Sequence, residues 1–228
     1  MVRAGGMSAG LTQMGHEQVP LWQADDAHPA PEALVDAAQQ GEFRREAGDL
    51  YPGLRAPVPD GYAAWLAQTV GALLASDTAA AVCLRASFAV AGDDPSRLAP
   101  IQRIPHFDDC SDAIVAAVHY LCAAPHGGTS FYRHRATGFE RITAARLPLW
   151  RQALVRDGAA HGLPPQTYHE GDSPAFERIG QTALAFNRLI LYPANCLHGG
   201  DVAGSWRIAG TSPRLTVTSL VRLDRPLA

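Results

Sequence analysis

A histidine and an aspartate lie two residues apart, at His106 and Asp108, and a second histidine, His198, lies far downstream. In an extended strand, residues i and i+2 point to the same face, so His106 and Asp108 could reach one ion. His198 follows a short apolar stretch and a turn, and it could supply a third ligand. Two imidazoles and one carboxylate on one face of an octahedron leave three open positions, as in non-haem Fe(II) sites. We therefore predict a metal site formed by His106, Asp108 and His198, called the triad below.

Other interpretations of these residues remain open. A His-x-Asp pair can occur by chance in a chain of this composition, so the triad could be a surface turn and two unrelated histidines. Cys196 lies two residues before His198 and suggests zinc instead. Structural zinc sites use four protein ligands, and no second cysteine is placed to complete such a site.

The composition is that of a chain large enough for one compact domain. It has 228 residues, of which 47% are hydrophobic and 18% are charged, and a chain of this size buries a substantial core. The formal net charge of -3 indicates neither a nucleic-acid partner nor a membrane surface. No apolar run approaches the roughly 18 residues that a membrane span needs. The four cysteines form no CxxC motif, which favours free thiols and a cytoplasmic location.

The N-terminal third predicts structural support rather than chemistry. Residues 1–18 are small and polar and predict a flexible leader. Pro31–Gln40 has a proline at its start and is followed by a glycine, which predicts a short helix. Residues 49–59 are rich in proline and predict a connector, and residues 60–74 carry apolar side chains at helical spacing. We expect residues 19–80 to form a helical support for the rest of the chain.

Strand patterns dominate from residue 81 onward. The expected strands are 82–90, 114–121, 131–134, 139–143, 176–186, 189–192 and 214–223. A helical insert is expected at about residues 145–165, and whether residues 147–165 act as a lid is left open. Short strands joined by Gly- and Pro-rich turns favour a β-sandwich or barrel over βαβ units. We predict a single domain over residues 19–228, mainly β with flanking helices, whose core spans 81–223.

The order of several motifs resembles the Fe(II)/2-oxoglutarate-dependent oxygenase superfamily. In chain order, the matching motifs are His106-x-Asp108, Tyr120-Leu121, Gly127-Gly128-Thr129, Asn187-Arg188-Leu189-Ile190-Leu191-Tyr192-Pro193, His198 and Arg214-Leu215-Thr216. Residues 127–140 look like a small bacterial group of that superfamily without a settled general function. The resemblance covers residues 80–223 and implies a double-stranded β-helix, a jelly-roll or cupin-like core. The N-terminal third carries no part of it.

The resemblance also implies cofactors and roles. Fe(II) would bind the triad, with 2-oxoglutarate as cosubstrate and O2 as oxidant. Arg214 would bind the distal carboxylate of 2-oxoglutarate, because a guanidinium offers a planar fork and stays charged. Thr216 and Tyr120 would donate hydroxyl hydrogen bonds to the same carboxylate. The alternatives are that Arg214 is a solvated strand-end residue, that Tyr120 is core, and that Arg207 binds the cosubstrate instead.

Arg133 and Arg135 form a basic pair beside the expected site. In a strand they share a face, so one of them could bind a substrate carboxylate. The alternative, two solvated arginines, carries equal weight. His119 lies beside Tyr120 and would face the opposite side of the strand, where a hydrogen-bonded structural histidine is expected rather than a ligand.

These patterns lead to a functional hypothesis. The resemblance implies oxidation of an unactivated C–H bond of a small molecule, such as an amino acid or a natural-product intermediate. Hydroxylation, desaturation and cyclisation all remain possible outcomes, whereas the carboxylate of Asp108 argues against halogenation. A peptidyl-residue hydroxylase of the same chemistry, or a cupin-like metal protein that does not use 2-oxoglutarate, are the alternatives. We expect a monomer or homodimer with no nucleic-acid or membrane partner.

Overall fold

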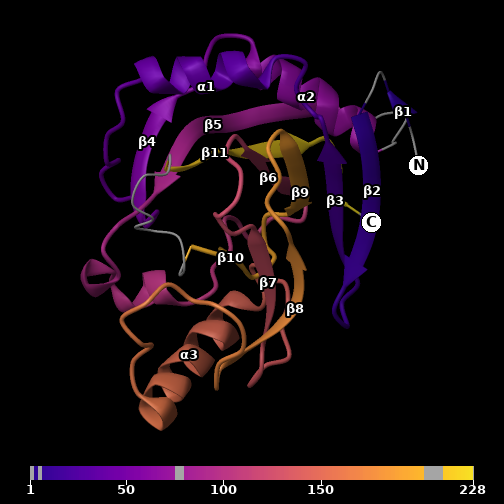
Figure 1. Ribbon diagram of the computed structural model, residues 1–228. Coiled ribbons are helices and arrows are strands. Elements are labelled where there is room, and N and C mark those ends of the chain that lie inside the picture. The colour runs from indigo at the N-terminus through magenta and orange to yellow at the C-terminus, as the bar shows by residue number, and fades with distance from the viewer. Residues whose placement is uncertain (1–2, 5–6, 75–79, 203–212, 228) are drawn as a thin grey trace.

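The computed structural model describes residues 3–4, 7–74, 80–202 and 213–227 of the chain. Within these residues the protein is mainly β, with helices flanking two antiparallel sheets (Figure 1). The larger sheet has the strand order β1-β2-β3-β9-β6-β11-β5-β4 and the smaller has the order β10-β7-β8. The strands are β1 (Arg3–Ala4), β2 (Met7–Met14), β3 (Val19–Asp25), β4 (Gly53–Pro57), β5 (Ala81–Ala91), β6 (Ile114–Tyr120), β7 (Thr129–His134), β8 (Phe176–Thr182), β9 (Arg188–Pro193), β10 (His198–Gly200) and β11 (Arg214–Leu223). The helices are α1 (Pro31–Gln40), α2 (Tyr62–Leu73) and α3 (Leu147–His161), with short 3-10 helices at Pro95–Arg97 and Pro100–Arg103.

The larger sheet separates two environments. Figure 1 shows α1 and α2 over one face of this sheet, above β4 and β5. On β11, Leu215 and Val217 belong to the buried cluster that also contains Leu66 and Val70 of α2. Successive strand residues point to opposite faces, so the alternate positions of β11 face away from the helices. Those positions line a cavity: Arg214, Thr216 and Thr218.

The smaller sheet packs against that second face. Phe131 of β7 meets Tyr192 of β9 edge to face, with ring centroids 5.0 Å apart, and both rings are fully buried in one cluster with Val118 of β6. Aromatic rings bury much apolar surface, so this contact holds the two sheets together. The predicted fold class, mainly β with flanking helices and a jelly-roll core, is confirmed.

The N-terminal segment differs from the prediction. A flexible leader was expected over residues 1–18, but β2 pairs with β3 along its whole length, and β3 pairs in turn with β9. The segment 19–80 is likewise not only helical, because it contributes β3 and β4. Main-chain hydrogen bonds to neighbouring strands hold β2, β3 and β4 in the sheet, and such long-range pairing leaves no local pattern from which these strands could be predicted. The division of the chain into support and core stays a prediction.

One further local prediction needs correction. The strand expected at 139–143 is absent from the described residues, where the chain instead forms one bridge between Arg141 and Cys196. The helical insert expected at about residues 145–165 is α3, which ends at His161 before Gly162, whose φ of 79° suits glycine. Across the described part of the chain, no helix combines the length and the apolar character needed to cross a bilayer.

Candidate metal centre

The triad converges on one wall of the cavity. His106 and Asp108 lie between the second 3-10 helix and β6, and His198 begins β10 of the smaller sheet. One potential ligand atom from each of the three side chains lies within 4.8 Å of the others. His198 Nε2 is 3.6 Å from Asp108 Oδ2. The fold thus brings together side chains that the sequence separates widely, at the spacing that a shared ion needs.

Backbone pairing sets the separation of the two histidines. The His106 amide donates to the His198 carbonyl at 2.9 Å, and the His198 amide donates back at 2.8 Å. The Asp108 amide donates to the Ala194 carbonyl at 2.8 Å. His106 therefore lies in an isolated bridge rather than in the regular strand that the His-x-Asp spacing suggested. The positions of the ligand-bearing segments are fixed by main-chain bonds.

The imidazole of His198 is oriented by a carbonyl group. Its Nδ1 lies 3.0 Å from the carbonyl oxygen of Cys196, to which it can only donate. In the neutral ring this leaves Nε2 unprotonated and facing Asp108, which is the tautomer that a metal ligand requires. Cys196 is fully buried, and burial raises the pKa of its thiol. Cys196 therefore contributes its carbonyl oxygen rather than its sulfur, which argues against the zinc alternative.

His106 is held in its neutral form. His106 is exposed to the cavity, but the protein atoms packed around its ring disfavour the charged form and lower its pKa from 6.5 to about 4, with the neighbouring His198 adding to the shift. A neutral imidazole keeps a lone pair for a cation. Two imidazoles and one carboxylate form a donor set that fits a divalent transition metal.

The cavity next to the triad has a volume of about 440 Å³. It exists because small residues occupy inward positions of its walls, among them Ala91 of β5, Ala116 of β6 and Gly200 of β10. Arg214 and Thr216 line the same cavity. Cavities of several hundred Å³ are typical of sites for small molecules.

Arg214 is buried, with 6% of its surface exposed. Its Nε donates to the Gly127 carbonyl at 2.9 Å and its Nη2 donates to the Gly128 carbonyl at 2.7 Å. Among the described residues, no carboxylate lies within ion-pair distance of its guanidinium. Carbonyl groups orient a guanidinium but do not neutralise it, so a buried positive charge faces the cavity without a counter-charge.

Two glycines make this arrangement possible. A Cβ at Gly127 would lie 2.1 Å from the Asp201 carbonyl oxygen, and one at Gly128 would lie 1.8 Å from the Thr182 carbonyl oxygen. Any side chain at either position would therefore push the turn away from its neighbours. The close packing of this turn places its two carbonyls against Arg214.

Tyr120 and Thr216 are opposite each other in the pairing of β6 and β11. Both are buried. The Tyr120 hydroxyl forms a 2.7 Å hydrogen bond with the Thr129 hydroxyl, and burial raises the pKa of Tyr120 to about 12. Thr216 makes a long contact of 3.4 Å to the Ala89 carbonyl and lines the cavity. Thr216 and Thr129 thus line the cavity, whereas Tyr120 does not, and its hydroxyl is bonded to that of Thr129.

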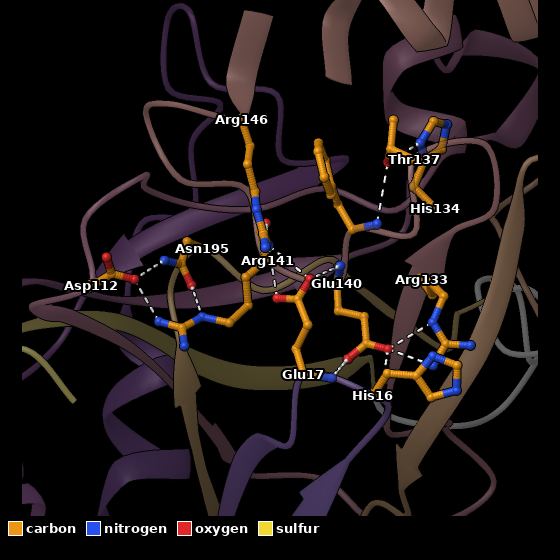
Figure 2. Close-up of polar contacts among 11 residues, drawn as sticks. His16, Glu17, Asp112, Arg133, His134, Thr137, Glu140, Arg141, Arg146 and Asn195 are labelled. Atoms are coloured by element: carbon orange, nitrogen blue, oxygen red, sulfur yellow. Dashed lines mark hydrogen bonds and ion pairs between the residues drawn. The ribbon is translucent and has the colours of Figure 1, made fainter. Parts of the chain in front are cut away.

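Arg133 is directed away from the triad. Figure 2 shows its guanidinium against the carboxylate of Glu140, to which it donates at 2.8 and 2.6 Å. A further bond of 3.0 Å reaches Glu177. Arg133 does not line the cavity, so the expected contact with a substrate carboxylate finds no support in its position.

Glu140 is fully buried and also accepts hydrogen bonds from the main chain of the turn between β2 and β3. The amides of His16 and Glu17 donate to it at 2.8 and 2.9 Å (Figure 2). A Cβ at Gly15, whose φ is +67°, would lie 2.3 Å from a carboxylate oxygen of Glu140. This carboxylate therefore fastens the N-terminal hairpin to the segment after β7.

Arg135 is also outside the cavity. It is partly exposed and pairs with Asp172 at 3.2 Å. Arg207, the alternative to Arg214, lies outside the described residues.

The cavity also contains residues that sequence reasoning passed over. Tyr51, Arg55 and His169 all line it. Arg55 is paired with Asp49 at 2.5 Å. His169 has a buried Nε2 without a hydrogen-bond partner among the described residues, and burial lowers its pKa. The proline-rich connector and the loop before β8 gave no signal beyond their composition.

His119 lies on the opposite face of the larger sheet from the triad. Its Nε2 donates to Asn187 Oδ1 at 3.0 Å, and its Nδ1 then accepts from the Tyr62 hydroxyl at 3.2 Å. It is fully buried, and burial lowers its pKa to about 4. His119 is thus a hydrogen-bonded core residue, as expected from its position beside Tyr120.

A family model described as "Family of unknown function (DUF6445)" matches residues 6–221. The chain belongs to this family. No curated protein matches this DUF6445 chain.

Solved structures similar to this DUF6445 chain include HygX from Streptomyces hygroscopicus, with nickel, 2-oxoglutarate and hygromycin B bound. That match has 12% identity and a TM-score of 0.50, and it covers 89% of this chain and 82% of HygX. The epimerase SnoN in complex with Fe3+, alpha ketoglutarate and nogalamycin RO matches at 14% identity and a TM-score of 0.48, over 89% of this chain and 78% of SnoN. AviO1 from Streptomyces viridochromogenes Tue57 matches at 11% identity and a TM-score of 0.44, over 97% of this chain and 91% of AviO1. At this identity, the comparison with HygX shows a similar fold and not a shared function.

Proposed function

We propose that this protein is an Fe(II)- and 2-oxoglutarate-dependent oxygenase that acts on a small molecule. One observation carries the proposal. The triad and Arg214, a buried guanidinium without a carboxylate partner among the described residues, line the same cavity. A cation site and an arginine without a carboxylate partner that line one cavity suit a ligand that has a chelating group at one end and a carboxylate at the other.

His106, Asp108 and His198 would hold the iron. The two imidazoles and one carboxylate form the donor set expected for non-haem iron, which leaves positions free for other ligands. When bound, the iron would supply the activation of O2 and of the 2-oxo acid that C–H oxidation needs. The carbonyl of Cys196 keeps Nε2 of His198 free of a proton and directed at the centre.

Arg214 would bind the distal carboxylate of 2-oxoglutarate. The carbonyls of Gly127 and Gly128 occupy Nε and Nη2 and fix the plane of the guanidinium, so its remaining donors need not be ordered when the ligand arrives. Thr216 would add a hydroxyl donor from the same strand. Tyr120 would act through Thr129, because its own hydroxyl is bonded to that residue.

The substrate would be a small molecule. A cavity of about 440 Å³ must hold the cosubstrate as well, which leaves room for a compact substrate such as an amino acid or a natural-product intermediate. HygX, whose fold is similar, binds the small molecule hygromycin B together with 2-oxoglutarate, and this supports a small molecule, rather than a protein, as the class of substrate. Hydroxylation, desaturation and cyclisation are all compatible with it, and Asp108 favours these outcomes over halogenation.

The test is ligand binding followed by turnover. Protein loaded with Mn(II) under nitrogen should bind 2-oxoglutarate in a calorimetric titration. Protein loaded with Fe(II) in air, with ascorbate, should then release succinate. His198→Ala should lose both properties, whereas His161→Ala, a change at an exposed position of α3, should keep both. If the wild-type protein binds the metal but not 2-oxoglutarate, a cupin-like metal protein becomes the better assignment.

A further inference from the structure

Tyr51 has a buried hydroxyl group without a hydrogen-bond partner among the described residues. It lies in the connector just before β4, outside the segment that carries the superfamily motifs, and it lines the cavity. Buried polar atoms nearly always have a partner, so an unpaired one beside a cavity points to a ligand.

Contacts on two sides fix the position of the Tyr51 ring. The guanidinium of Arg55 lies over the ring, 4.3 Å from its centroid. The ring also passes close to Gly53, since a Cβ at that position would lie 2.9 Å from its Cε1 atom. The Tyr51 amide donates to Asp49 Oδ1 at 2.9 Å, and Asp49 also pairs with Arg55. The ring is therefore held rigidly before any ligand binds.

The sheet register places this ring near Arg214. Gly53 of β4 is opposite Ala91 of β5, and Ala91 is opposite Arg214 of β11. These residues form one row across three strands, with neighbouring strands about 4.8 Å apart. Tyr51, two residues before Gly53, packs against the buried cluster that contains Ala91. Tyr51, Ala91 and Arg214 therefore line the same part of the cavity.

The hydroxyl stays protonated at neutral pH. Burial raises the pKa of Tyr51 to about 12, although the positive charges of Arg214 and Arg55 oppose this shift. The group can therefore donate a hydrogen bond, and it lies within the electrostatic reach of Arg214. The hydroxyl donor of Tyr51 and the positive charge of Arg214 line the same cavity, and together they are complementary to an anion.

We propose that Tyr51 donates a hydrogen bond to the carboxylate that Arg214 binds. This inference rests on the proposed function and adds to it a residue from the N-terminal support. Tyr51 suits this role better than Tyr120, whose hydroxyl is already bonded to Thr129. The pair of Tyr51 and Arg214 would select 2-oxo acids that carry a second carboxylate over those that carry only one.

Tyr51→Phe tests this role, because it removes the hydroxyl and keeps the ring. In calorimetric titrations of Mn(II)-loaded protein under nitrogen, the Kd of 2-oxoglutarate should rise about 10-fold, as for the loss of one hydrogen bond to a charged group. The Kd of 2-oxobutyrate, which lacks the distal carboxylate, should stay unchanged. Tyr168→Phe is the matched control. Tyr168 lines the same cavity, but its hydroxyl donates to the Asp93 carbonyl at 2.9 Å, so this variant should bind 2-oxoglutarate as the wild type does.

Thermal unfolding of the ligand-free protein gives an independent readout. Removing an unpaired buried hydroxyl should leave the Tm of Tyr51→Phe equal to that of the wild type or higher. A lower Tm together with unchanged 2-oxoglutarate affinity would assign the hydroxyl to structure and overturn the inference, while the proposed function would stand. If the wild-type protein itself does not bind 2-oxoglutarate, the proposed function fails and this inference fails with it.

Discussion

Arg133 and Arg214 are both largely buried strand residues, yet their surroundings are opposite. Arg133 on β7 meets two carboxylates, Glu140 and Glu177. Arg214 on β11 meets two carbonyl groups and, among the described residues, no carboxylate. A buried charge is tolerated when the chain supplies its counter-charge, and otherwise it awaits one from a ligand. The difference teaches that the counter-charge, more than burial or strand position, distinguishes the structural Arg133 from Arg214, for which we propose a ligand as the partner.

The largest expected effect is a loss of stability when Arg133 loses its main carboxylate partner. Glu140→Ala should lower the free energy of unfolding by about 3–5 kcal/mol, because it leaves Arg133 buried without its main partner. It also removes the acceptor for the amides of His16 and Glu17. Urea denaturation measures the change. Glu177→Ala is the control: its side chain is 39% exposed, so the loss should be no more than about 1 kcal/mol. Equal losses in the two variants would remove the distinction between them.

A second test concerns His119, a buried group that stays neutral instead of finding a counter-charge. Its pKa is 6.5 in the unfolded chain and about 4 in the folded one. Below pH 6.5 the unfolded state binds a proton that the folded state excludes. The free energy of unfolding should therefore fall as the pH falls from about 6.5 to about 4, by up to about 3 kcal/mol.

Urea denaturation at a series of pH values measures this slope. His119→Gln should make the slope smaller without abolishing it, because the lowered pKa of His106 adds a slope over the same pH range. His161→Gln, a change at an exposed position of α3, should leave the slope unchanged. An unchanged slope in His119→Gln would assign it to other titrating groups.

The third effect concerns Arg214 and the affinity of the protein for 2-oxoglutarate. Arg214→Ala should raise the Kd of 2-oxoglutarate about 10-fold or more, the scale expected for a lost charge-assisted bond. The stability should change little, because no carboxylate among the described residues loses its partner. Titration of Mn(II)-loaded protein measures the affinity, with Arg135→Ala as a variant outside the cavity. Unchanged affinity in Arg214→Ala would transfer the role to Arg207.

The smallest effect is expected at Arg135. This residue is 41% exposed and pairs with Asp172, which is 61% exposed. Arg135→Ala should lower the free energy of unfolding by no more than about 1 kcal/mol, since exposed ion pairs contribute little. A loss as large as that of Glu140→Ala, measured in the same urea series, would show that exposure does not rank these ion pairs.

Some features of the fold and of the candidate site could be predicted from the sequence, and others could not. The bounds of α1 and β11 agree with the prediction, because their apolar periodicity and terminal residues are local signals. The order of the motifs along the chain led to the prediction that His106, Asp108 and His198 lie close together. The partners of Arg133 did not follow, because a strand pattern reports which face a residue occupies and not what lies opposite. Tyr51 reaches the cavity through the pairing of β4 with β5, a long-range contact that no local pattern encodes.

The paired amides and carbonyls of His106 and His198 have a consequence for how the centre is loaded. Main-chain hydrogen bonds already hold the two imidazole-bearing segments together, so an ion would not have to assemble them. A chelator should therefore strip the centre without melting the β core, and the same molecules should accept fresh ion afterwards. If the triad binds metal as proposed, the protein should be obtainable without its ion, and different metals should be comparable in one unchanged scaffold.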